Sequence, residues 1–269
     1  MDSESILPEL DSPRIAVLRM EGTNNEEEAF QSFRRSGAAP EFVHVNEITR
    51  GHVDLENFST IFIPGGFSAG DYVRAGAIFA ARLRFSAMDK LLRFIKSEKP
   101  VIGVCNGFQV LAELGLIPDI EGKRERVVTL AQNASSRFEC RYVYMKMTSK
   151  NAIFNTRFSN GKPRQVPVAH AEGRVVAASR NLMEQIDENG QILFRYSNPE
   201  GTGCGYPWNP NGSDLDIAAI TNPAGNVIGL MPHPERVYYN FQMMGNEKGN
   251  INGTGKDFFD SIVDFIRKK

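Results

Sequence analysis

The sequence has few cysteines and histidines, and its charges are nearly balanced. Three cysteines in 269 residues are an odd, widely spaced set, which argues against a disulfide framework and favours a reducing cytoplasm. The formal net charge of −1 provides no field that would draw the chain to nucleic acid or to acidic lipid. No apolar run approaches the length that spans a bilayer. A cytoplasmic protein without nucleic-acid or membrane partners is therefore expected.

The composition is ordinary for a globular protein, with 41% hydrophobic and 23% charged residues. Residues 1–12 mix acids, serines and prolines without the apolar core of a secretion signal, and we interpret them as an N-terminal extension. No linker or internal repeat follows. Residues 13–269 are therefore expected to form a single domain.

Short apolar runs alternate with amphipathic segments in the first half of the chain, which predicts parallel βαβ units with helices on both faces of a sheet. The second half is richer in strand-like segments, and Asn222-Pro223-Ala224-Gly225 between two of them predicts a hairpin. The predicted class is α/β, with a mostly parallel central sheet and a partly antiparallel second half. Strands are expected at 14–20, 41–45, 60–63, 101–104, 127–130, 138–147, 165–170, 174–178, 216–220 and 227–231, and helices at 25–36, 78–97, 107–114 and 256–266.

Two stretches rich in glycine, proline and asparagine, residues 197–213 and 240–254, are predicted to be loops. Loops of this length in a compact domain are usually functional or disordered. A solvated insertion and a partner-facing loop are equally compatible with their composition.

The segment Gly103-Val104-Cys105-Asn106-Gly107 follows an apolar strand and begins a helix, as in a nucleophile elbow with cysteine in place of serine. The two glycines allow the sharp turn that such an elbow requires. At a helix N-terminus the dipole favours a thiolate, and the amide of Asn106 can donate to an oxyanion. A buried structural cysteine is the alternative for this motif taken alone.

A base for the thiol is available among only four histidines. His233 follows an apolar strand and lies between two prolines that fix the backbone, and Glu235 is close enough to orient its imidazole. Cys105, His233 and Glu235 are thus the predicted nucleophile, base and orienting residue. The turn Pro64-Gly65-Gly66 ends another strand, and an amide near Gly66 is predicted to complete the oxyanion hole with Asn106.

Together these elements resemble the class I, or triad, glutamine amidotransferases. The family patterns G-x-C-x-G-x-Q, H-P-E and P-G-G are matched in order at residues 103–109, 233–235 and 64–66. This resemblance implies a flavodoxin-like fold for residues 13–269 and a thioester mechanism on glutamine. It also implies that Gln109, Gly65, Phe67, His170 and Glu172 contact the substrate, although His170 could equally be a satisfied strand-end histidine.

Within that family the chain is similar to the glutaminase subunits of phosphoribosylformylglycinamidine synthase. Residues 65–71, 105–109, 133–139 and 229–236 carry this closer resemblance. It implies purine biosynthesis, with a large synthetase subunit and a small accessory subunit as partners. The synthetase subunit would use ATP and Mg²⁺, because this chain has no phosphate-binding loop motif. No metal or cofactor is expected in this chain.

Other classes remain open at the level of sequence. The pairs His170/Glu172 and His233/Glu235 would suit a zinc hydrolase, although the deaminase signature is absent. A DJ-1-like cysteine hydrolase or stress protein also has an elbow cysteine. An amidotransferase subunit of another pathway and a catalytically inactive scaffold are the remaining alternatives. Cys140 and Cys204 have no neighbours in sequence that would activate a thiol.

Overall fold

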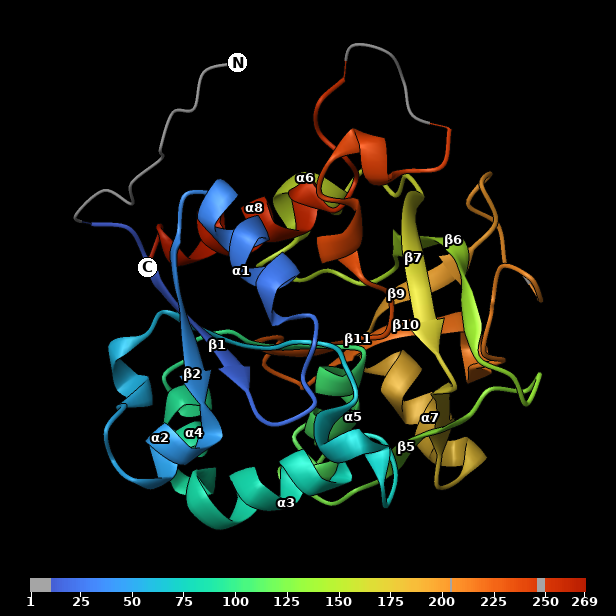
Figure 1. Ribbon diagram of the computed structural model, residues 1–269. Coiled ribbons are helices and arrows are strands. Elements are labelled where there is room, and N and C mark those ends of the chain that lie inside the picture. The colour runs from blue at the N-terminus through green and yellow to red at the C-terminus, as the bar shows by residue number, and fades with distance from the viewer. Residues whose placement is uncertain (1–10, 204, 246–249) are drawn as a thin grey trace.

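The computed structural model describes residues 11–203, 205–245 and 250–269, and its core is a twisted sheet of nine strands (Figure 1). Neighbouring strands are parallel through β2-β1-β3-β4-β11 and antiparallel through β11-β10-β9-β6-β7. The predicted α/β class with a partly antiparallel second half is confirmed. In sheet order the strands are β2 Ala39–His44, β1 Arg14–Arg19, β3 Thr60–Ile63, β4 Val101–Val104, β11 Val227–Leu230, β10 Ile217–Thr221, β9 Ile192–Ser197, β6 Glu139–Met147 and β7 Arg164–His170.

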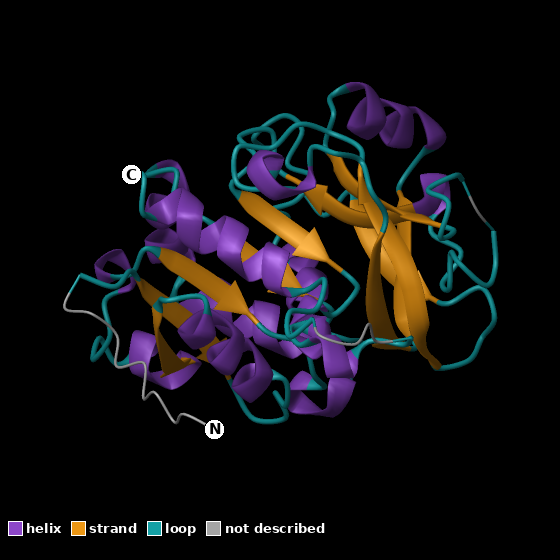
Figure 2. Cartoon of the chain, turned by 90° about the horizontal axis from the view of Figure 1, so that it is seen from above, coloured by secondary structure: helices purple, strands orange, loops and turns teal. Residues whose placement is uncertain are grey.

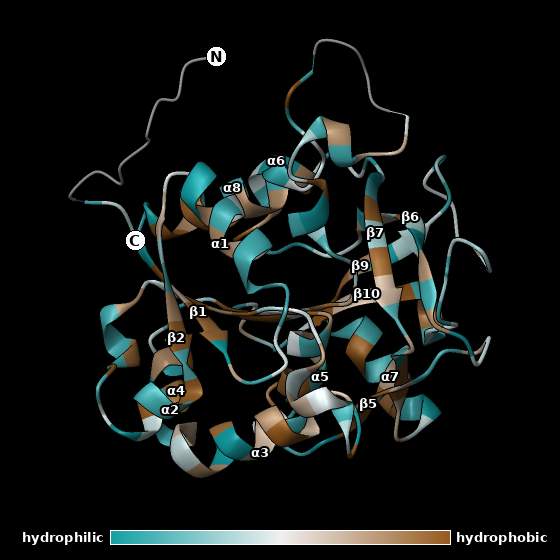
Figure 3. Cartoon of the chain, in the orientation of Figure 1, coloured by the Kyte–Doolittle hydropathy of each residue, from teal (hydrophilic) through white to brown (hydrophobic). Residues whose placement is uncertain are grey.

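The central strands are buried along their whole length because their sequences are apolar without interruption. Every residue of β3, β4 and β11 is buried, as expected for parallel strands covered on both faces. Figure 3 shows brown along the central strands and a mixture of teal, white and brown along the helices around them. The predicted bounds of β3 and β4 coincide with the observed ones.

Helices cover both faces of the parallel part (Figure 1). On one face, Phe33 of α1 packs edge-on against Phe62 of β3 and Phe259 of α8, with ring centroids 5.2 and 4.9 Å apart. Burial of each ring contributes roughly 2–3 kcal/mol. The helices are α1 Glu26–Arg35, α2 Val45–Thr49, α3 Ala77–Ser86, α4 Met88–Lys96, α5 Asn106–Glu113, α6 Asn155–Phe158, α7 Arg180–Glu188 and α8 Lys256–Ile266.

The antiparallel part lies beside the helix-rich part, as the view from above shows (Figure 2). The predicted hairpin is confirmed, because β10 and β11 pair antiparallel across residues 222–226. A separate two-stranded sheet pairs β5, Val128–Gln132, with β8, Glu172–Ala177. The curl of the sheet brings the end of β7 to the segment after β11, where the amide of His233 donates to the carbonyl of Pro167 at 2.9 Å.

Several local predictions differ from the structure. The single helix expected at residues 78–97 is two helices, because Ala87 leaves helical geometry at φ −140°. Helix α7 and strand β9 were not expected. The 240–254 stretch is not wholly irregular, since residues 240–242 form a short 3₁₀ helix and Tyr239 pairs with Asn252. No described helix has the length and apolar character needed to cross a membrane.

Candidate active site

Cys105 occupies a strained turn between β4 and α5. Its φ of 51° is unusual for a residue with a side chain, and its amide donates to the carbonyl of Leu230 at 2.7 Å. The flanking glycines are needed for steric reasons: a Cβ on Gly103 would lie 2.4 Å from the carbonyl oxygen of Gly107, and one on Gly107 would lie 2.0 Å from that of Ile63. The predicted elbow is therefore present, with its cysteine at the N-terminus of α5.

His233 and Glu235 form a buried pair directly after β11. Their side chains are 2% and 1% exposed, and Nδ1 of the imidazole lies 2.6 Å from Oε1 of the glutamate. Burial lowers the pKa of His233, but the Glu235 carboxylate and then the Cys105 thiol raise it, to about 10. This electrostatic balance favours the imidazolium form of His233.

The space between the thiol and the imidazole is kept open by Gly65. A Cβ at this position would lie 2.7 Å from Cε1 of His233 and 3.3 Å from Cβ of Cys105. One methyl-sized group would thus touch both side chains, so the two are close neighbours in space. The three residues predicted as nucleophile, base and orienting group are brought together.

The two predicted oxyanion donors lie on separate segments beside Cys105. Asn106 is the first residue of α5, where an amide has no acceptor within the helix. Gly66 follows β3 with a φ of 138°, a conformation that only glycine adopts readily, and it lines the same cavity as Cys105. Two βα turns thus place Gly66 and Asn106 beside the thiol, where an oxyanion hole requires its donors to lie.

A cavity of about 190 Å³ contains most of the predicted substrate contacts. Its volume is of the order of one amino-acid side chain. The cavity is lined by Cys105, Gly66, Phe67, Gln109, His170 and Glu172, and also by Asp71, Ala75, Ala169 and Ala171.

Gln109 and Glu172 are joined across this cavity. The Gln109 amide nitrogen donates to the carbonyl of Glu172 at 2.5 Å, and the Glu172 carboxylate accepts from the amide of Ala75 at 3.1 Å. Asp71 also lines the cavity but was not predicted from the sequence. Burial, and then the charge of Glu172, raises the pKa of Asp71 to about 6. Two carboxyl groups thus line the cavity together.

His170 ends β7 and is fixed in one tautomer by Asn133. The Asn133 amide nitrogen donates to the carbonyls of Arg137 and His170, and its oxygen accepts from the amide of Gly173. The Nδ1 atom of His170, 3.1 Å from that oxygen, must therefore carry the proton. Burial and then the charge of His233 lower the pKa of His170 to about 3. Its Nε2 has no hydrogen-bond partner among the described residues, so the strand-end histidine is only half satisfied.

The sequence also failed to reveal two residues behind the imidazole. The amide nitrogen of Asn25 lies 3.2 Å from Nδ1 of His233, and the Asn25 oxygen accepts from Arg236 at 2.5 Å. Asn25 is 2% exposed and follows the end of β1. The available signal was its place at the carboxyl end of a parallel strand, where sites of open α/β sheets lie.

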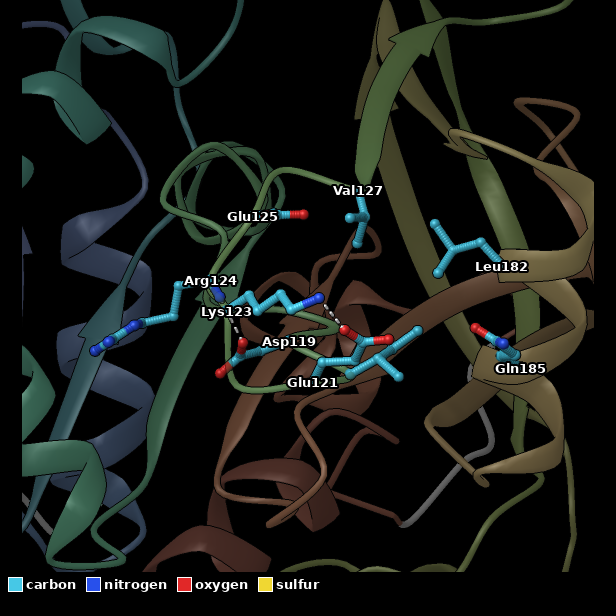
Figure 4. Close-up of a pocket in the computed structure, with 9 residues that line it drawn as sticks. Asp119, Glu121, Lys123, Arg124, Glu125, Val127, Leu182 and Gln185 are labelled. Carbon is cyan, nitrogen blue, oxygen red and sulfur yellow. Dashed lines mark hydrogen bonds and ion pairs between the residues drawn. The ribbon is translucent and has the colours of Figure 1, made fainter.

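The remaining predictions concern other thiols, metals and cavities. Cys140 is exposed, and Cys204 lies outside the described residues. No group of three His, Cys, Asp or Glu side chains in the described part of the chain could hold a metal ion. A second cavity, between residues 119–127 and α7, contains the ion pair of Lys123 and Glu121 and none of the predicted site residues (Figure 4).

Comparison with known families agrees with this geometry. Residues 12–266 match the model of the CobB/CobQ-like glutamine amidotransferase domain. The phosphoribosylformylglycinamidine synthase subunit PurQ of Picrophilus torridus is 55% identical over 250 residues, which cover 93% of this chain and 97% of that protein. The PurQ subunit of Archaeoglobus fulgidus is 44% identical over the full length of both proteins.

Solved structures give the same result. A chain in the structure of PurLQS from Thermotoga maritima superposes with a TM-score of 0.72 at 30% identity, covering 94% of this chain and 99% of that one. The glutaminase domain of Trypanosoma brucei CTPS, solved with bound acivicin, has a TM-score of 0.56 at 16% identity and covers 96% and 95%. The second similarity concerns the fold alone.

Proposed function

The chain belongs to the CobB/CobQ-like glutamine amidotransferase domain family, and from this we propose that it is the glutaminase subunit of a phosphoribosylformylglycinamidine synthase in purine biosynthesis. The observation that carries the chemistry is the buried constellation of Cys105, His233 and Glu235, of which Cys105 lines a cavity of about 190 Å³. The relatives named PurQ, which span nearly the whole chain, support the choice of pathway. Family membership also argues against the DJ-1-like alternative.

The reaction begins on the glutamine carboxamide. The Cys105 thiolate forms a bond to the carboxamide carbon while the carbonyl electron pair moves onto oxygen. The amides of Gly66 and Asn106 donate to this oxyanion, which bears a charge only after attack. The imidazolium of His233, whose pKa is raised by Glu235, then protonates the nitrogen. The carbon–nitrogen bond breaks, ammonia leaves, and a thioester remains.

Hydrolysis of the thioester completes the cycle. Neutral His233 takes a proton from water, the hydroxide attacks the thioester carbon, and the carbon–sulfur bond breaks to release glutamate. The proton that His233 acquires restores the thiolate–imidazolium pair. Gln109, Gly65, Phe67, His170 and Glu172 contact the bound glutamine. No metal or cofactor of this chain takes part.

The ammonia is consumed elsewhere. Ammonia is mostly protonated near neutral pH and is nucleophilic only as the free base, so direct transfer into a partner avoids its loss. A large synthetase subunit would use ATP and Mg²⁺ to activate formylglycinamide ribonucleotide, with a small accessory subunit completing the assembly. The complex would be cytoplasmic, as the few cysteines favour a reducing compartment.

Site-resolved labelling tests the assignment. An electrophilic analogue of glutamine should modify Cys105 alone, and excess glutamine should protect it. Cys140 and Cys204 serve as internal controls, since neither is expected to combine a thiolate with a glutamine pocket. Peptide mass spectrometry would count against the proposal if Cys105 stayed unmodified, or if Cys140 reacted equally and without protection.

A further inference from the structure

The position of Gly66 beside Cys105 is not set by the β3–β4 ladder, and its one strand-like pairing is an isolated bridge to Thr23 in the segment after β1. The β3–β4 ladder ends with the pair Ile63 and Gly103, and residues 64–67 extend beyond it. Gly66 has a φ of 138°, and consecutive glycines at 65 and 66 leave the backbone many alternatives. Something beyond the ladder must therefore fix the direction of the Gly66 amide.

Backbone hydrogen bonds fix one side of this loop. The amides of Phe67 and Ala69 donate to the carbonyls of Gly22 and Glu21, at 3.1 and 2.8 Å. These bonds tie the loop to the segment after β1, but they do not tie it to the nucleophile. The residues that follow are strained, because Ala69 and Asp71 have φ values of 51° and 53°. Residues with a side chain rarely adopt positive φ, so contacts with the surrounding structure must stabilise this conformation.

The link to the nucleophile is a side-chain hydrogen bond. Ser68 Oγ donates to Asn106 Oδ1 at 2.6 Å, and both residues are 2% exposed. The Asn106 amide nitrogen donates to Gln109 Oε1 at 3.0 Å and to Asp71 Oδ1 at 3.3 Å. The opposite orientation of this amide would place its oxygen against two acceptors, so its oxygen faces Ser68.

The backbone and the side chain of Asn106 thus have separate roles. Its backbone amide is one proposed oxyanion donor, and its side chain binds the loop that carries the other. We propose that Ser68 is a positioning residue that sets the spacing of the two oxyanion donors through its hydrogen bond to the Asn106 side chain. This inference rests on the proposed glutaminase function of the same site.

The effect of losing this bond should appear in the transition state. The oxyanion exists only after attack on the carbonyl, so weaker donation lowers kcat while the ground-state affinity for glutamine is preserved. Loss of a whole oxyanion donor lowers kcat by roughly 100- to 1000-fold, and displacement of one donor should lower it about tenfold. Thiolate formation depends on His233 and Glu235 and should not change.

The test compares Ser68→Ala with the unaltered full-length chain, each reconstituted with its synthetase subunit. We expect kcat for glutamine to fall about tenfold, with KM and the rate of Cys105 modification by a methanethiosulfonate reagent unchanged within about twofold. That reagent reports on the thiolate without forming an oxyanion. Ser261→Ala is the matched control, since Ser261 is 1% exposed and donates to a carbonyl at 2.7 Å on α8.

A double-mutant cycle with Asn106→Ala separates positioning from general structural damage. Ser68→Ala should have no further effect on kcat in that background. Additive losses, an unchanged kcat in the single variant, or slower Cys105 modification would each overturn the inference. Failure of the proposed function would look different, because the unaltered chain reconstituted with the synthetase subunit would then show no glutamine-dependent turnover.

Discussion

The electrostatics of the triad lead to a quantitative prediction for Glu235→Gln. This change keeps the side-chain volume but removes a negative charge 2.6 Å from Nδ1 of His233, where both side chains are almost fully buried. Two charges about 4 Å apart attract by about 4 kcal/mol at an effective dielectric constant of about 20. The rise of the His233 pKa from 6.5 to about 10 is a net effect, because burial lowers this pKa while Glu235 and then Cys105 raise it.

Loss of this interaction lowers the pKa of His233 and reduces the thiolate–imidazolium population. We expect the equilibrium constant between the ion pair and the neutral pair to fall about 1000-fold, because about 4 kcal/mol corresponds to about three powers of ten. As a result kcat/KM for glutamine near pH 7 should fall by about tenfold or more. The direction in which the pH–rate profile should shift follows from the same interaction between Glu235 and His233. Imidazolium persists in the unaltered protein up to about pH 10, so the alkaline limb of the rate profile should move to lower pH in the variant.

The assay is the pH dependence of kcat/KM together with the rate of Cys105 modification by a methanethiosulfonate reagent, and both should fall. Glu47→Gln is a matched control, because Glu47 contacts His52 Nδ1 at 3.0 Å on the surface, where the side chains are 38% and 61% exposed. Solvent screening makes such exposed pairs weak, so the control should retain full activity. A loss below tenfold for Glu235→Gln would refute the electrostatic reasoning.

Two further predictions concern stability. Gly107→Ala should lower the free energy of unfolding in urea by about 3 kcal/mol, because its Cβ would lie 2.0 Å from the Ile63 carbonyl oxygen. The matched control Gly205→Ala should change it by at most about 0.5 kcal/mol, because no described atom beyond its chain neighbours would lie within 4 Å of the new Cβ. Equal effects of the two changes would contradict the packing. Asp71→Asn should stabilise the protein at pH 7.5 by about 1 kcal/mol after screening. The folded state favours the protonated carboxyl of Asp71, so the stability that this group contributes is lost as pH rises from 3.8 through about 6. The difference in stability between the variant and the unaltered protein should therefore vanish in thermal melts below about pH 4. A variant less stable than the unaltered protein at pH 7.5 would contradict this prediction.

The sequence was sufficient for the elements whose signals are local. Short, mostly apolar runs marked β3, which is followed by Pro64-Gly65-Gly66, and β4, which follows Pro100. The residue types around Cys105 and His233 follow from the chemistry that a thiol nucleophile needs. The steric limits at Gly103 and Gly107 are the physical reason for that local pattern.

Contacts between segments that are distant in the sequence could not be predicted from local patterns. The contact of Asn25 with His233 and the hydrogen bond of Ser68 to Asn106 join residues 208 and 38 positions apart. Nothing in the local pattern of an asparagine or serine reveals such a partner, since both residues are common in ordinary turns. The tautomer of His170, with its proton on Nδ1 and none on Nε2, is set in turn by three hydrogen bonds of Asn133. Periodicity also failed at Ala87, where a continuous helical pattern is divided into two helices.

The most direct test of the central claim is the Cys105→Ala variant in complex with the synthetase subunit, measured with each of two nitrogen donors. The account predicts that glutamine no longer supports amidine formation, while free ammonia supports it at the rate of the unaltered complex. Persistence of glutamine-dependent turnover would show that Cys105 is not the nucleophile and would contradict the account.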